Sequence, residues 1–169
     1  MNNILQNTSI INSKRQPPNL KKQLTRAMFS ENPVQDYTVT KCLKGNCGTC
    51  QHLIEADKYA FKCGVSFKIK IDISCDVKNV IYAIICRGCN KEYVGETNNL
   101  RKRITVHKQQ IRDPSIRILK VSKHIDECSS QDPKFSVFPF YKMNSDDGTF
   151  RKKKELYFIK LLKPELNCN

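Results

Sequence analysis

The chain has no tryptophan, and its 16 acidic residues are few beside the 30 basic ones in a length of 169 residues. Hydrophobic residues make up 39% of the sequence, and no apolar run approaches the length that a membrane-spanning helix needs. The opening stretch MNNILQNTSIINSKRQPP lacks the continuous apolar segment of a secretory signal. These shortages argue against a membrane protein or a secreted protein, and the length allows one modest core.

The composition has an excess of positive charge. The net charge is +14 and the isoelectric point is near 9.5. Such a balance favours a polyanionic partner, most simply DNA, although a solubilising surface is the alternative that net charge alone leaves open. The charge is clustered as RKR at 101–103 and RKKK at 151–154, which favours DNA. We expect no membrane partner and no small-molecule cofactor.

Nine cysteines are many for this length, and the odd number does not suit a scaffold of disulfides. Two CxxC pairs occur, Cys47/Cys50 and Cys86/Cys89. Outside the secretory route such pairs more often bind metal, so we predict thiolate–zinc sites in a reducing, intracellular and nuclear setting. A thiol-redox role for the second pair is a weaker alternative, because the pair lacks the βαβ context of such proteins.

The chain divides into three segments by composition. Residues 1–36 are polar with proline breakers and predict a basic linker that is poorly ordered. Residues 37–76 are rich in cysteine and predict a zinc-knuckle-like segment, in which the alternating stretch 65–73 reads as a half-buried strand. Residues 77–169 carry the apolar periodicity of a folded domain.

Within the last segment the pattern predicts an α+β fold, with a small antiparallel sheet of about three strands flanked by helices. The element ranges follow from short β-branched runs, helical spacing and breakers. The expected strands are 80–86, 92–94 and 134–140. The expected helices run from a cap at Thr97 or Asn98 to about 112, over 117–126, and over 150–162.

Several side chains in this segment suit hydrolysis of a phosphodiester, which needs a base for water and a cation for the phosphate. Tyr82 and Tyr93 offer phenols on neighbouring strands, and Arg103 and His107 lie four residues apart on one helix face. Arginine suits a phosphate because its planar fork can bind two oxygens. Taken singly, each of these residues more often has a structural role; their combination favours a site.

Glu155 supplies an acid on the last expected helix. It falls on the stripe of Phe158 and Leu162, so its carboxylate lies on or beside the buried face and needs a partner or a metal. A salt bridge to Arg151 or Lys152 is the plain alternative. Mg²⁺ or Mn²⁺ is often held by one or two carboxylates with water and phosphate, so one glutamate suffices for a one-metal site.

The order of these residues resembles the GIY-YIG nuclease family. The matching motifs are VIY at 80–82, YVG at 93–95, LxxRxxxH at 100–107, Glu155, and PELN at 164–167. Val80 replaces the first glycine of the family pattern, and Gly95 corresponds to its turn glycine. The resemblance implies a general base, a helper, a phosphate ligand, a proton-transfer residue, a metal ligand and a brace: in that order Tyr82, Tyr93, Arg103, His107, Glu155 and Asn167.

A CxxC pair placed between VIY and YVG resembles more closely the endonuclease domain of Penelope-like retroelements. That resemblance implies a zinc site of Cys86 and Cys89 with His124 and Cys128, three cysteines and one histidine where two of each are usual. The upstream cysteines form a second candidate zinc site, with Cys75 and His52 as alternatives for the fourth ligand: Cys42, Cys47, Cys50 and Cys63. Cys168 has no evident partner.

Two functions compete on these grounds. The first is a divalent-metal-dependent DNA nickase derived from a retroelement, in which residues 14–28 would connect to a reverse transcriptase that this chain lacks. The second is a catalytically inactive, zinc-stabilised nucleic-acid-binding module. Only the first requires that Tyr82, Arg103 and Glu155 converge on one point.

Overall fold

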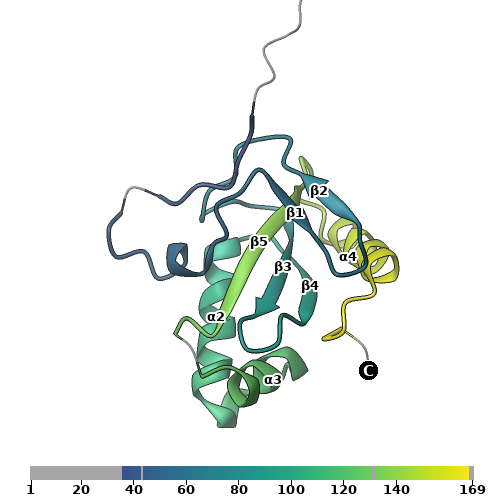
Figure 1. Cartoon of the computed structure of the whole chain (residues 1–169). Coiled ribbons are helices and arrows are strands. Elements are labelled where there is room, and N and C mark those ends of the chain that lie inside the picture. Colours follow the sequence, from purple (N-terminus) through teal and green to yellow (C-terminus); the bar gives the residue numbers. More distant parts are fainter. Residues whose placement is uncertain (1–35, 43, 131, 168–169) are drawn as a thin grey trace, which may run out of the picture. The chain divides into compact units, whose positions relative to one another are not determined.

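The centre of the fold is strand β3 (Val80–Cys86), every residue of which is buried. The computed structural model describes residues 36–42, 44–130 and 132–167, so the predictions for the first segment and for Cys168 lie outside the described residues. β3 pairs antiparallel with β4 (Glu92–Thr97) on one side and β5 (Phe135–Lys142) on the other. The α+β prediction with a three-stranded antiparallel sheet is therefore confirmed (Figure 1).

Helix α2 (Leu100–Arg112) follows β4 directly and buries Leu100, Ile104 and Ile111 against the sheet. Its cap is Asn99, whose side-chain oxygen accepts a hydrogen bond from the Lys102 N–H at 3.0 Å. The expected caps, Thr97 and Asn98, were wrong because the side chain of Thr97 instead bonds the backbone of Asn99. The helix ends before Pro114, which opens a short 3₁₀ turn, η2 (Pro114–Ile116).

Helix α3 (Lys120–Cys128) begins three residues later than the sequence predicts. The reason is Arg117, whose guanidinium donates to the carbonyls of Gln110 and Ile111 at the end of α2 and to the Asp126 carboxylate. Those bonds satisfy carbonyls that the helix end leaves open. Helix α4 (Gly148–Leu162) begins after the Asp147 cap and packs against β4 and β3. In Figure 1, α2 and α3 are seen to the left of and below the sheet, and α4 to its right.

The cysteine-rich segment contains a 3₁₀ turn, η1 (Cys50–His52), and a hairpin of β1 (Lys58–Ala60) and β2 (Ser66–Lys68). The strand expected over 65–73 is much shorter in the structure, because β1 offers only three residues for pairing. Beyond it Ile71 is exposed, while Ile73 forms a parallel bridge with Val39.

Four phenylalanines join the hairpin to the C-terminal part of the chain. Their ring centroids lie between 5.0 and 5.7 Å apart, mostly edge to face: Phe61, Phe67, Phe140 and Phe158. They come from the hairpin region, β5 and α4, so the position of α4 depends on the upstream segment. Residues 36–169 form one compact unit. The segment boundary near residue 76 stays a prediction.

None of the helices in the described ranges is long and apolar enough to span a bilayer.

Candidate active site

The hydroxyl of Tyr82 is the centre of a buried hydrogen-bonded cluster. Tyr82 has no solvent exposure, and its oxygen lies 2.8 Å from Nε2 of His107. Arg103 donates from Nε to the same oxygen at 3.1 Å. The i, i+4 spacing of Arg103 and His107 on α2 lets both reach one atom of β3. The structure thus brings together three of the residues singled out in the sequence.

Burial sets the charge states in this cluster. It raises the pKa of the Tyr82 phenol well above its ordinary value, although Arg103 opposes that shift. Burial, assisted by the positive charge of Arg103, lowers the pKa of His107 to about 3. His107 is therefore neutral at physiological pH, and it can exchange a hydrogen bond with Tyr82 without carrying charge.

Gly95 fills the narrow space between the two tyrosines. It pairs directly across from Tyr82 in the sheet register. A Cβ at this position would lie 2.8 Å from the Tyr82 hydroxyl oxygen and 2.8 Å from Cε1 of Tyr93, closer than carbon atoms approach in real structures. The resemblance implied a turn glycine, but Gly95 lies inside β4, and the close approach of the rings is what requires glycine.

Glu155 lines a cleft of about 460 Å³, and Arg103, Lys102 and Glu96 also belong to its lining. Its Oε1 accepts a hydrogen bond from the Glu96 N–H at 3.2 Å. Burial and the neighbouring Glu96 carboxylate raise the pKa of Glu155. A second carboxylate nearby and a raised pKa are conditions that a bound cation relieves.

Arg151 forms an ion pair with Glu96, and Glu155 takes no part in that pair. Arg151 is buried, and its Nε donates to the Glu96 carboxylate at 2.9 Å, while Nη1 contacts Asn79 and Asp146. Within the described residues no ion pair joins Glu155 to Arg151 or Lys152, so the salt-bridge explanation of Glu155 was wrong. Sequence reasoning missed the Glu96–Arg151 pair, and no local pattern links two residues so far apart.

The 151–154 basic run is less available to a partner than the sequence suggested. Arg151 is engaged as described, and the Lys154 ammonium lies 5.5 to 5.7 Å from the ring centroids of Phe150, Tyr141 and Tyr157. Lys152 and Lys153 remain exposed.

Tyr93 and Asn167 flank the Tyr82 hydroxyl, and the Tyr93 phenol interacts with the Arg103 guanidinium. The Tyr93 ring lies 6.0 Å from that of His107, and burial raises the pKa of its phenol. The Asn167 amide exchanges two hydrogen bonds with the backbone of Val94, one residue before Gly95. Asn167 therefore acts on β4 and not on a substrate.

The donor set at the cleft fits a hard divalent ion. The carboxylate of Glu155 keeps Oε2 without a hydrogen-bond partner among the described residues, and its Oε1 accepts one backbone N–H. Mg²⁺ and Mn²⁺ bind through such oxygens together with water and phosphate. The side chain that would hold the ion is Glu155, and the ion would polarise a phosphate oxygen.

Two further clusters have the chemistry of zinc sites. Each holds four ligand atoms that lie within 4.8 Å of one another: Cys42, Cys47, Cys50 and Cys75 in one, and Cys86, Cys89, His124 and Cys128 in the other. Sulfur–sulfur distances of 3.7 and 3.5 Å in the first cluster are close to the edge of about 3.8 Å that a tetrahedron with Zn–S bonds of 2.3 Å requires. Both donor sets fit tetrahedral zinc.

Cys75, and not Cys63, completes the first cluster. Cys63 is exposed in the tight turn between Phe61 and Gly64, whereas Cys75 is buried 3.7 Å from the Cys47 sulfur. The choice of Cys63 as fourth ligand was wrong, because Cys63 is exposed and is not among the sulfurs that lie within 4.8 Å of one another. His52, the second alternative, stacks on Phe135 and bonds its carbonyl. The guanidinium of Arg101 on α2 donates to the Cys75 sulfur at 3.1 Å.

The comparisons with known proteins match the part of the chain that forms the cleft. The family model of the GIY-YIG catalytic domain matches residues 78–167. No curated protein matches the chain. Among solved structures, the catalytic domain of the homing endonuclease I-TevI is similar, with 21% identity and a TM-score of 0.40, over 51% of this chain and 89% of that chain. Because the family match spans more than half of its length, the chain belongs to the GIY-YIG catalytic domain family, which implies DNA endonuclease activity.

Proposed function

We propose that the protein is a divalent-metal-dependent endonuclease that nicks one strand of DNA. The observation that carries the proposal is the meeting of Arg103 and His107 at the Tyr82 hydroxyl, beside a cleft that also holds Glu155. A packing role for the tyrosine would not need a cation and an imidazole at the same oxygen.

The tautomer of His107 follows from its unpaired nitrogen. Nδ1 is buried and has no hydrogen-bond partner. An orphaned buried N–H is rarer than an orphaned acceptor, and a lost partner costs about 1–3 kcal/mol. We infer that Nδ1 carries no proton and that Nε2–H donates to Tyr82. The Tyr82 oxygen then accepts from two donors, which favours its ionised form and offsets part of the burial cost.

This arrangement assigns a role to each group during hydrolysis. The oxygen of a water molecule forms a bond with phosphorus while the bond to the leaving sugar oxygen breaks. The Tyr82 phenol, whose pKa burial raises, first loses its own proton to solvent with the help of the Arg103 charge. The proton of the attacking water then passes to the Tyr82 oxygen, and solvent protonates the leaving oxygen. Arg103, which lines the cleft, binds the phosphate through its guanidinium and stabilises the charge of the transition state. Glu155 would hold the Mg²⁺ or Mn²⁺ ion.

Nicking is favoured over double-strand cleavage by the number of carboxylates. The cleft offers Glu155 as the carboxylate without an ion-pair partner in the described ranges, since Glu96 is paired with Arg151. One cation and one base serve one phosphodiester at a time.

Supercoiled plasmid provides the test. Wild-type protein with Mg²⁺ or Mn²⁺ should yield open circles, and chelation of the ion should stop the reaction. Glu155→Gln and Tyr82→Phe should each lose about a hundredfold or more in rate, which is typical of removing an electrostatic catalyst. Glu127→Gln, an exposed acid on α3, is the matched control and should cut like the wild type. Equal nicking by all variants would favour the inactive binding module.

We also propose a Penelope-like retroelement origin with structural zinc at both clusters. Support comes from the CxxC pair of Cys86, at the end of β3, and Cys89, in the turn that follows, and from their partners His124 and Cys128. Sequencing the genomic neighbourhood tests the origin, because a reverse-transcriptase frame beside the coding sequence is expected. A locus without any retroelement remnant would contradict it.

A further inference from the structure

A second basic cavity lies on the flank of α2 that faces away from the cleft. Its volume is about 540 Å³, and it separates α2 from the loop that carries the first cysteine cluster. Four cations line it, three from α2 and one from the loop: Arg101, Lys108, Arg112 and Lys44. No acidic side chain belongs to its lining. We call it the rear groove.

Two of the four cations already have partners. Arg101 donates to the Cys75 sulfur, and Lys108 donates to the Gly48 carbonyl at 3.1 Å. A tetrathiolate zinc would bring a charge of about −2, and Arg101 is placed to offset part of it. Both contacts hold the cysteine loop against α2.

Lys44 and Arg112 are exposed, and within the described residues their side chains have no hydrogen bond or ion pair. Asp76 lies close enough for Lys44 and Arg101 to lower its pKa, but its own hydrogen bond with Ser74 is the larger cause. Two unneutralised cations in a concave site suit an anion from outside the chain.

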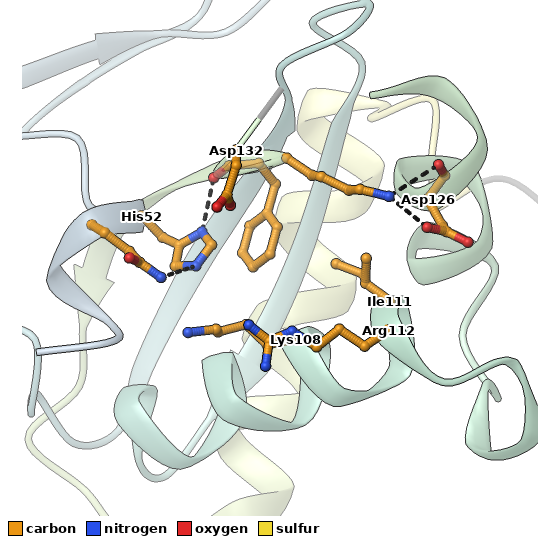
Figure 2. A pocket seen from close by; sticks show the side chains of 9 residues that line it. His52, Lys108, Ile111, Arg112, Asp126 and Asp132 are labelled. Carbon is orange, nitrogen blue, oxygen red and sulfur yellow. Dashed lines mark hydrogen bonds and ion pairs between the residues drawn. The ribbon is translucent and has the colours of Figure 1, made fainter. Parts of the chain in front are cut away.

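Figure 2 shows a neighbouring pocket that shares Lys108 and Arg112 with the rear groove. Lys108 and Arg112 stand on α2 at one side of an adjoining pocket of about 420 Å³, with His52 and Asp132 across from them. The Asp126 carboxylate at the far end is occupied by Lys134 and Arg117. Lys108 and Arg112 therefore line both cavities.

The exposed surface of α2 lies between the cleft and the rear groove. Lys102 and Val106 line the cleft, Thr105 and Gln109 line the rear groove, and all four are exposed. An α-helix with its side chains is about 10–12 Å across. The major groove that separates the two phosphate strands of B-DNA is about 12 Å wide.

We propose that the rear groove binds backbone phosphates of the strand that is not cut, so that duplex DNA straddles α2. This inference rests on the proposed nuclease function, because it takes the cleft to hold the cut strand. Lys44 and Arg112 are the phosphate-binding residues, and Arg101 and Lys108 are positioning residues that keep the loop in place. A single strand held in the cleft would not reach the rear groove without wrapping the helix.

The test measures binding, in a Glu155→Gln background that removes cleavage. Affinity for a short duplex and for one of its strands is followed by fluorescence anisotropy across a range of salt. Lys44→Gln with Arg112→Gln should weaken duplex binding at least about tenfold and flatten the log–log salt dependence by about two units, since each lost phosphate contact removes about 0.9. Single-strand affinity should change much less.

Lys120→Gln with Lys123→Gln, two exposed lysines on α3 outside both cavities, is the charge-matched control and should leave both affinities unchanged. Zinc content and melting temperature check that the loop stays folded. An unchanged duplex slope in the double variant would overturn the inference, and so would an equal loss for single and double strands. Neither result depends on cleavage, so a wild type that fails to nick plasmid would contradict the proposed function and leave this measurement intact.

Discussion

The side-chain amide of Asn167 pairs with the backbone of Val94 as a neighbouring strand would. Its Oδ1 accepts from the Val94 N–H at 2.7 Å and its Nδ2 donates to the Val94 carbonyl at 2.8 Å. β4 is an edge strand of the sheet, so these two bonds satisfy groups that would otherwise face water. They also fix the strand between Tyr93 and Gly95.

Asn167→Asp should therefore destabilise the protein more than Asn167→Ala. Both substitutions leave the Val94 carbonyl without its donor, at a cost of about 1–3 kcal/mol, and the aspartate in addition places a second acceptor against that carbonyl, which repels it. Urea unfolding of the two variants beside the wild type measures the difference. Equal stabilities would show that the amide contributes no directional bond.

Gly95→Ala should lower the nicking rate at least about tenfold, because the new methyl group must displace Tyr82 or Tyr93 from its place by the steric overlap described above. Gly45→Ala is the matched control, since nothing lies within 4 Å of a Cβ at that position. The rates are compared at saturating DNA, with melting curves for both variants. Full activity in Gly95→Ala would mean that the rings can shift without loss of geometry.

Cys75→Ser and Cys63→Ser form a matched pair for the upstream zinc site. Cys75→Ser should lose one zinc equivalent per chain and melt at a lower temperature, since structural zinc contributes directly to folding. Cys63→Ser should keep the wild-type zinc content because Cys63 is not part of the cluster. Metal analysis by mass spectrometry decides; a zinc loss in Cys63→Ser alone would reverse the assignment.

Stability should fall as the pH is lowered from about 6.5 towards 3, through the protonation of His107 in the unfolded chain. The folded pKa of His107 is about 3 and its ordinary value is 6.5. Between these values the unfolded state binds the proton and the folded state does not, so the cost rises by up to about 1.4 kcal/mol per pH unit.

His107→Gln should remove that part of the slope. The difference between the pH dependences of the wild type and this variant isolates His107 from the acid sensitivity of the thiolates. Urea unfolding at several pH values supplies both curves. Parallel curves would show that His107 is accessible to protons in the folded state.

Local sequence patterns were sufficient for the catalytic half of the fold. The run of β-branched residues at 80–86 predicted β3 at its observed bounds, because a short, continuous apolar stretch has few other places than the centre of a sheet. Spacing on α2 was enough to place Arg103 and His107 on one face. The helix at 148–162 was expected within two residues of its start.

Long-range contacts account for what the sequence did not reveal. Sequence spacing alone does not choose between Cys63 and Cys75, and only the fold around the hairpin decides between them. The pairing of Arg151 with Glu96 depends on α4 lying beside β4. The rear groove depends on how the cysteine loop folds back on α2, through the contact of Lys108 with Gly48.

The ring cluster of Phe61, Phe67, Phe140 and Phe158 limits where the polypeptide can be truncated and where its gene can recombine. A polypeptide starting at residue 78, where the family match begins, would lose the first two rings and open the other two to water. Each buried aromatic ring is worth about 1.5–3 kcal/mol, a large share of the stability of a small domain. The upstream segment is thus no detachable module, and recombination that exchanged it for an unrelated sequence would have to replace the missing half of that cluster.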